Sequence, residues 1–182
     1  MGWLLAVVVA LVVGVVLLYN RLVGARNRVE EAWAQVDVQL RRRHDLIPNL
    51  VETVRAYATH EREVFEAVTR ARAEAIGPHS PGEQAAVEEQ LTGAVRSLFA
   101  VAEGYPELQA SANFLELQRE LASTEDRIAY SRQYYNAAVQ RYDTMRETFP
   151  ANLLAGPLGF TGREYYEAEP AARAVPPASF GG

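Results

Sequence analysis

Two residue types, cysteine and lysine, are absent from this chain of 182 residues. Without cysteine the chain has no disulfide bond, no thiolate nucleophile and no cysteine-ligated metal, which fits a reducing compartment. All 18 basic residues are therefore arginine, a bias that we attribute to a GC-rich genome rather than to function. No stretch alternates between apolar and polar residues with a period of two, so the sequence predicts no β-strand.

Signatures of catalysis, phosphate binding and metal binding are missing as well. The chain has no G-x-S-x-G nucleophile elbow, no P-loop and no G-x-G-x-x-G turn. His60-Glu61 begins like a zinc-protease helix, but the second histidine would have to stand at position 64, which is Val64. None of the three histidines has the Glu three residues earlier that a di-iron bundle uses. We therefore expect no enzyme activity, cofactor or metal, and keep an enzyme or metalloprotein only as a remote alternative.

The longest stretch without a charged residue is Trp3–Tyr19, which also lacks amides and proline. Seventeen helical residues reach about 26 Å, and the next turn completes the roughly 30 Å of a hydrocarbon core if Arg21 extends to the headgroups. Trp3 and Tyr19 stand at the two ends, where amphipathic rings favour the membrane interface. A cleaved signal peptide is the alternative, but Met1-Gly2 carries no basic side chain and no A-x-A site follows. We therefore interpret residues 1–20 as a retained transmembrane anchor.

Charge sets the expected orientation and the expected partners. No arginine precedes the anchor and three follow it closely, so we expect the amino terminus outside a bacterial cell membrane and the domain in the cytoplasm. Residues 20–45 hold six arginines against four acids, a net charge of +2, whereas residues 46–182 hold twelve against nineteen, a net charge of −7. This distribution favours anionic membrane lipid as a partner and argues against nucleic acid.

Helical periodicity continues from Leu22 to Pro150 and predicts an all-α fold. The expected architecture for residues 21–150 is an antiparallel four-helix bundle whose first helix extends into the single transmembrane helix. We place a turn near His44, with Asp45 as N-cap and Pro48 in the first turn of a second helix that reaches Ala75. The alternative is that Pro48 only kinks one long helix. We favour the turn because an isolated helix of about 80 Å would leave its apolar stripe uncovered.

The last two long helices have clear start signals. Ser80 and Glu83 form a capping-box pattern, and Asn113 with Glu116 marks a second start. Spacings of three and four predict a seam of coiled-coil type at Phe114, Leu117, Leu121, Thr124, Ile128, Ser131, Tyr135, Ala138, Tyr142, Met145 and Phe149. Residues 151–169 carry enough apolar side chains for an ordered extension that docks on the bundle. We expect residues 170–182 to be a disordered tail.

Three features are candidates for an interaction surface or a buried charge. Arg41-Arg42-Arg43 is the densest charge run; we favour solvated side chains with ion pairs to Glu residues over a docking surface for an acidic partner. Tyr130 and Tyr134 fall off the seam, and exposed aromatic side chains mark interfaces. Glu61 interrupts an apolar stripe. We favour an ion pair with an arginine of a facing helix over an unpaired buried carboxylate with a raised pKa.

The sequence resembles the LemA family over nearly all of residues 1–169. The resemblance rests on Tyr19–Val23, Arg26–Val29, Ala32-Trp33, Asp37–Leu40, Arg42-Arg43, the run Asp45–Val51 with Pro48 and Asn49, Tyr57-Ala58, His60-Glu61, Ala112–Phe114, Tyr135-Asn136, Tyr142, Phe149-Pro150 and Gly159-Phe160. It implies a bacterial, membrane-anchored, antiparallel helical bundle with its bulk in the cytoplasm, and it implies no particular reaction. Members are often encoded near membrane metalloproteases, and one branch acts in building magnetosome membranes, which implies by analogy a role at membranes.

Three functions follow in order of preference. The first is a non-enzymatic, membrane-anchored adaptor or scaffold that works with membrane proteins the sequence does not identify. The second is a protein that forms homo-oligomers to organise or shape membrane. The third is the remote enzyme or metalloprotein.

Overall fold

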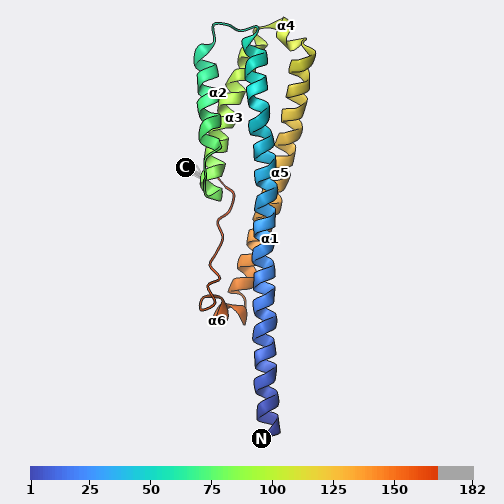
Figure 1. The fold of residues 1–182 in the computed structure, drawn as a ribbon, viewed down its shortest axis with the longest axis vertical. Coiled ribbons are helices and arrows are strands. Elements are labelled where there is room, and N and C mark those ends of the chain that lie inside the picture. The colour runs from blue at the N-terminus through green and yellow to red at the C-terminus, as the bar shows by residue number, and fades with distance from the viewer. Residues whose placement is uncertain (168–182) are drawn as a thin grey trace, which may run out of the picture.

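The computed structural model describes residues 1–167, and its regular secondary structure in that range is entirely helical (Figure 1). The prediction of an all-α fold is therefore confirmed. The helices in this range are α1 (Gly2–Arg55), α2 (Arg62–Ala75), α3 (Pro81–Glu103), α4 (Pro106–Gln109), α5 (Ala112–Glu147) and α6 (Ala151–Ala155).

Helix α1 has an apolar segment and a longer amphipathic segment, and the two have different surroundings. Residues 2–17 are all exposed, and α1 as a whole contains a stretch that is long and apolar enough to cross a membrane. From Leu22 to Val54, by contrast, every third or fourth residue is buried against the rest of the chain. The apolar segment and the first amphipathic segment are thus one uninterrupted helix of 54 residues.

The expected turn at residues 44–48 is wrong: α1 continues through Pro48 as far as Arg55. Proline lacks the N–H that would normally bond to the carbonyl four residues earlier, here that of His44. Arg72 of α2 supplies the missing donor, because its Nε donates to the His44 carbonyl oxygen at 2.6 Å. Asp45 is consequently an exposed residue inside α1 and not an N-cap.

The apolar stripe beyond Pro48 is covered, which removes the objection to one long helix. Ile47, Leu50 and Val54 are fully or almost fully buried in a core shared with α2, α3 and α5. The chain breaks instead at residues 56–61, where Ala58 is buried, and α2 begins at Arg62.

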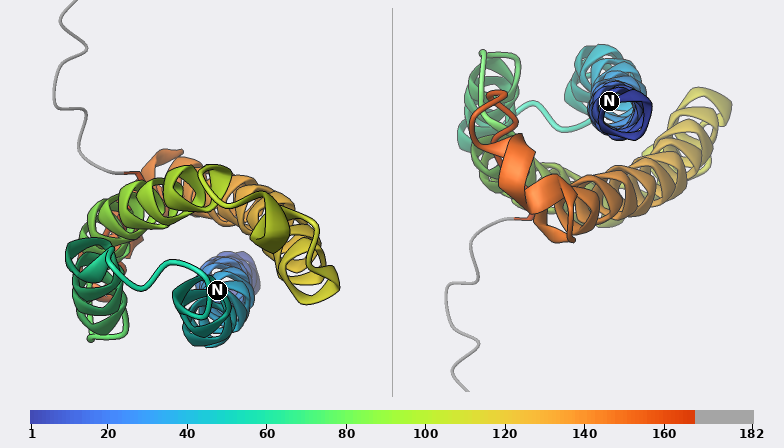
Figure 2. Two further views of the ribbon diagram at one scale, coloured as in Figure 1. Left: turned by 90° about the horizontal axis from the view of Figure 1, so that it is seen from above. Right: turned by 90° about the horizontal axis from the view of Figure 1, so that it is seen from below.

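The remaining helices are arranged around α1. Helix α5 returns beside α1 and makes the most extensive contact with it, and α2 and α3 form the second most extensive pair. Viewed along the long axis, α2, α3 and α5 form an arc that curves around α1 (Figure 2). One core lies at the end far from the amino terminus, and a second core, built on Leu22–Leu40, lies nearer to it.

The helix starts follow local signals with one correction. Ser80 caps α3, since its side chain accepts from the Glu83 N–H while the Glu83 carboxylate accepts from the Ser80 N–H. The start signal at Asn113 is two residues late, because α5 begins at Ala112 with Ser111 as its N-cap. In the expected seam, Val139 is buried in place of Ala138, and Phe149 lies beyond the helix end and is 73% exposed.

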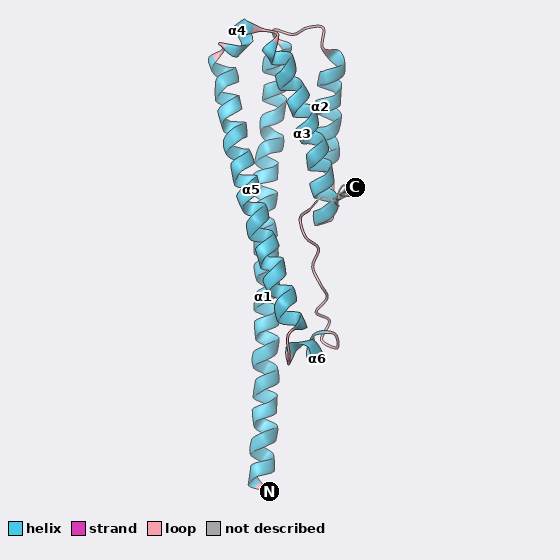
Figure 3. Cartoon of the chain, turned by 180° about the vertical axis from the view of Figure 1, so that it is seen from behind, coloured by secondary structure: helices cyan, strands magenta, loops and turns pink. Residues whose placement is uncertain are grey.

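Residues 156–167, which we call the strap, run from α6 back to the start of α3 (Figure 3). Tyr135 and Tyr142 of α5 donate hydrogen bonds from their hydroxyls to strap carbonyls at 2.7 and 2.8 Å. Phe160 and Tyr166 of the strap are buried in the core nearer the amino terminus. The end of the expected extension, residues 168–169, and the expected tail, residues 170–182, lie outside the described residues.

Candidate functional site

The candidate interaction surface at Arg41–Arg43, for which the sequence favours solvated side chains and ion pairs to Glu residues, divides into exposed and buried members. Arg41 pairs with Asp37 on its own helix at 2.8 Å and is largely exposed, and Arg42 is also exposed. Arg43 is only 3% exposed and points into the domain, so it does not belong to a surface. Consecutive helical residues point about 100° apart, which explains why one of the three is buried.

Arg43 and His44 are held by carboxylates from two other helices. Glu88 of α3 accepts from Arg43 Nη1 at 3.3 Å, and its other oxygen lies 2.6 Å from His44 Nε2. Arg43 Nη2 donates to the Thr92 hydroxyl at 2.6 Å. Arg43 Nε lies 3.0 Å from Glu125 Oε1 on α5, an ion-pair contact without hydrogen-bond alignment. These contacts join α1, α3 and α5 through one buried polar cluster.

Neighbouring groups complete this cluster. Gln84 donates both to Glu88 Oε1 and to the Ala75 carbonyl, each at 3.0 Å. Burial raises the pKa of Tyr166, and the nearby Glu88 carboxylate raises it further, so the phenol stays neutral. A buried arginine whose charge is paired with carboxylates from other helices is typical of a structural joint. Within residues 1–167 no group of three or more His, Asp or Glu side chains is arranged to hold a metal ion.

Glu61 fits neither of the two interpretations offered for it. It is partly exposed and occupies the N-cap position of α2, where its carbonyl accepts from the Val64 and Phe65 N–H groups at 3.2 and 3.3 Å. Among the described residues no cation lies within ion-pair distance of it. The apolar stripe is interrupted there because the helix itself is interrupted.

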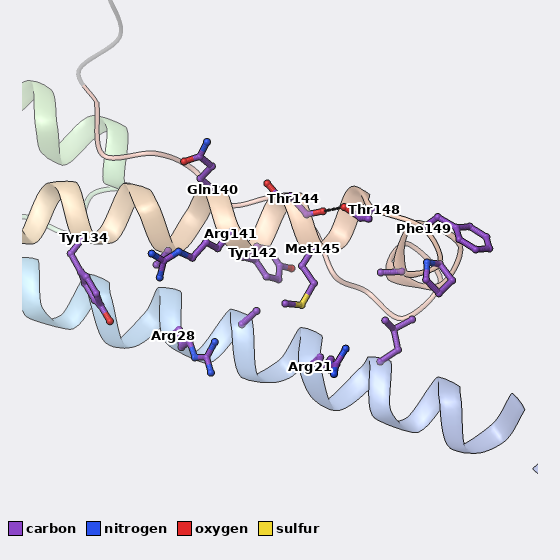
Figure 4. Close-up of a pocket in the computed structure, with 15 residues that line it drawn as sticks. Arg21, Arg28, Tyr134, Gln140, Arg141, Tyr142, Thr144, Met145, Thr148 and Phe149 are labelled. Carbon is purple, nitrogen blue, oxygen red and sulfur yellow. Dashed lines mark hydrogen bonds between the residues drawn. The ribbon is translucent and has the colours of Figure 1, made fainter. Parts of the chain in front are cut away.

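A second candidate region lies where the apolar segment of α1 meets the domain. A groove of about 610 Å³ runs between α1, the end of α5 and the start of α6 (Figure 4). We call it the basic groove because Arg21 and Arg28 of α1 and Arg141 of α5 line it. Its lining contains no Asp or Glu, and its apolar members are Leu18, Ala25, Ala138, Met145, Phe149, Pro150 and Ala151.

The other candidate residues lie at different positions along α1 and α5. Trp3 is 70% exposed near the start of α1. Tyr19 packs edge-on against Phe160 of the strap, with ring centroids 5.6 Å apart. Tyr134 lines the basic groove, and Tyr130, one turn earlier on α5, is 70% exposed.

Sequence reasoning missed Glu88 and Arg141. A signal for Glu88 was available, because Gln84, Glu88, Leu91 and Val95 share one spacing of three and four, which places two polar residues on a core-facing stripe. No local signal marks Arg141, since its neighbour Arg28 lies more than 100 residues away in the chain.

Comparison with known proteins agrees with the resemblance in the sequence. Magnetosome protein MamQ 2 of Paramagnetospirillum magneticum (strain ATCC 700264 / AMB-1) is 27% identical over 190 residues, covering 90% of this chain and 70% of that protein. Protein LemA of Metamycoplasma hominis (strain ATCC 23114 / DSM 25592 / NBRC 14850 / NCTC 10111 / PG21) is 24% identical over 140 residues, covering 75% of this chain and 63% of that protein. The family model described as LemA family matches residues 32–180. Because that match covers most of the chain, the protein belongs to the LemA family.

Proposed function

We propose that this protein is a single-pass membrane protein whose domain is an antiparallel four-helix bundle and serves as a non-enzymatic adaptor or scaffold. The observation that carries the proposal is the continuity of α1, whose exposed apolar segment leads without a break into the core of the domain. Membership of the LemA family and the candidate membrane-spanning helix support a location at a membrane.

Rigid coupling is the main mechanical consequence of this design. Leu22 is fully buried only three residues after Tyr19, so no flexible linker separates the anchor from the domain. The strap adds a second tie, because Phe160 contacts the Tyr19 ring and lies 5.8 Å from the Arg26 guanidinium. A tilt or rotation of the anchor would therefore move the whole domain. A scaffold that responds to the position of a membrane partner requires this coupling.

The proposed orientation places the amino terminus outside and the domain in the cytoplasm. Arg21, Arg26 and Arg28 follow the apolar segment and no arginine precedes it, which favours this orientation. The absence of cysteine makes the test direct, because any introduced cysteine is the sole label. In intact cells an impermeant maleimide should label Gly2→Cys and should label the exposed Gln118→Cys only after permeabilisation. Labelling of Gln118→Cys in intact cells would reverse the orientation.

The proposed protein-binding surface is centred on Tyr130 and Tyr134. Both are exposed on a helix that α1 holds in place along its length, and an exposed aromatic pair on a rigid element is a common anchor for a partner. A photo-crosslinking residue at position 130 should trap a defined membrane protein in native membranes, whereas the same residue at the exposed position Gln90 of α3 should not. Equal products at both positions, or none at position 130, would contradict the proposal.

A second candidate function is assembly of several copies that organise membrane. The continuity of α1 and the arginines that follow its apolar segment favour this alternative, and two of the similar proteins are named magnetosome proteins. The crosslinking experiment distinguishes the two, because a product with twice the mass of the protein supports self-assembly and a heterologous product supports the adaptor.

A further inference from the structure

We propose that the basic groove binds the phosphate headgroup of an anionic phospholipid from the leaflet in which the apolar segment of α1 ends. This inference rests on the proposed membrane anchoring, but it does not depend on orientation or on any protein partner. It assigns a specific ligand class to a site formed by α1, α5 and α6 (Figure 4).

The charges of the groove call for an anion. Three guanidinium groups, those of Arg21, Arg28 and Arg141, line it, and none of its lining residues is acidic. Among the described residues no carboxylate lies within ion-pair distance of these three side chains, whereas Arg26 of α1 and Arg163 of the strap share Glu30. Like charges around one groove repel each other, and a bound phosphate would relieve that repulsion.

The position of the groove points to lipid as the source of the phosphate. It begins at Leu18 inside the apolar segment, passes Arg21 and ends at Arg28, two turns farther from the membrane. The headgroup layer starts where the apolar segment ends, so Arg21 lies at its depth. Arginine side chains of this length keep an apolar stem in the hydrocarbon region and a charged end among the phosphates.

Apolar side chains at the same end of the domain support this placement. Phe149, Leu153 and Leu158 are 73%, 64% and 42% exposed. They belong to the segment around α6, which lies beside the apolar segment of α1 (Figure 1). A cluster of large exposed apolar side chains is unfavourable in water and stable at a membrane interface. With this corner in the interface, the apolar floor of the groove, Ala25, Ala138 and Met145, would face the glycerol and upper acyl region of a lipid.

The test uses the full chain in nanodiscs of equal amounts of phosphatidylcholine and phosphatidylglycerol, with native mass spectrometry of the lipids that stay bound after release. The wild-type protein should retain phosphatidylglycerol in preference. Arg28→Gln/Arg141→Gln should reduce that preference by roughly 30-fold, since each arginine near an anionic surface contributes about fivefold. The matched control Arg70→Gln/Arg119→Gln removes two exposed arginines of the bundle far from the groove and should retain the wild-type preference.

Several outcomes would overturn the proposal. Equal retention of the two lipids by the wild-type protein would do so, as would an unchanged preference in the groove variant or an equal loss in the control. Displacement of the lipid by millimolar inorganic phosphate would instead assign the groove to a soluble anion. The lipid test can fail while the crosslinking and labelling experiments give their expected results. That outcome would exclude the lipid site and leave the proposed function unchanged.

Discussion

Arginines at two places on α1 differ in what surrounds them. In the middle of the domain Arg43 is buried and contacts Glu88 and Glu125 from two other helices. Nearer the amino terminus Arg21 and Arg28 are exposed in a groove whose lining contains no acid. The same residue type on one continuous helix is thus a structural joint in one place and an open binding group in the other.

The groups around an arginine decide which of the two roles it has. A buried guanidinium is tolerable only where carboxylates and hydroxyls replace its water, and these partners are then committed to folding. An exposed guanidinium without a carboxylate keeps its charge available for a ligand. Substitutions in the first region should therefore change stability, and substitutions in the second should change binding.

The largest expected effect is in the buried cluster. Glu88→Ala leaves both Arg43 and His44 buried without their shared carboxylate, which should lower the free energy of unfolding by about 3–5 kcal/mol. Denaturant unfolding of the full chain in one detergent, followed by circular dichroism, measures this. Glu89→Ala, an exposed neighbour, is the control and should change stability by less than about 0.5 kcal/mol. Equal effects of the two substitutions would erase the distinction between the regions.

The next effect concerns how α1 passes Pro48 beside this cluster. Arg72→Ala removes the donor to the His44 carbonyl and should cost about 2 kcal/mol. In a Pro48→Ala background the restored N–H at position 48 can bond to the same carbonyl, so Arg72→Ala should cost much less there. A double-mutant cycle of unfolding free energies measures the coupling. An unchanged cost in both backgrounds would show that Arg72 does not replace the missing donor.

A smaller effect is expected at Tyr135, which lies on α5 between the two regions. Burial raises its pKa to about 12, and the Glu164 carboxylate adds to the rise while Arg163 opposes it. The unfolded phenol ionises near pH 10, so between pH 10 and 12 unfolding releases a proton and stability falls as pH rises. At pH 11 the loss should be about 1 kcal/mol relative to pH 9. The free energy of unfolding, measured at both pH values, should fall by this amount more in the wild-type protein than in Tyr135→Phe.

The smallest effect on stability is expected in the basic groove. Arg28→Gln/Arg141→Gln should leave the free energy of unfolding within about 0.5 kcal/mol of the wild-type value, because neither side chain is buried. The same unfolding assay used for Glu88→Ala checks this. A loss comparable to that of Glu88→Ala would mean that these arginines are structural, and the comparison between the regions would fail.

Much of the fold follows from local sequence patterns. The all-α class, the apolar segment that leads into an amphipathic helix, and the capping box at Ser80 all depend on residues within one or two turns of each other. The start of α5 was missed by two residues, because Ser111 and Asn113 are both acceptable N-caps by residue type. Candidate residues Arg41, Arg42, Tyr130 and Tyr134 are exposed, whereas Arg43 is not.

The all-helical class, the apolar segment and the asymmetry of charge could be read from the sequence alone, since these properties depend on residue type and on neighbours along the chain. Only the tertiary structure decided that α1 passes Pro48, because the replacement donor comes from Arg72, 28 residues after His44. It also decided which arginines are buried and which are open. Arg43 meets Glu88 from 45 residues away, and Arg28 meets Arg141 in one groove because α5 returns beside α1. Local periodicity can mark the buried face of a helix, but the partner that a buried charge meets is a property of the packed chain.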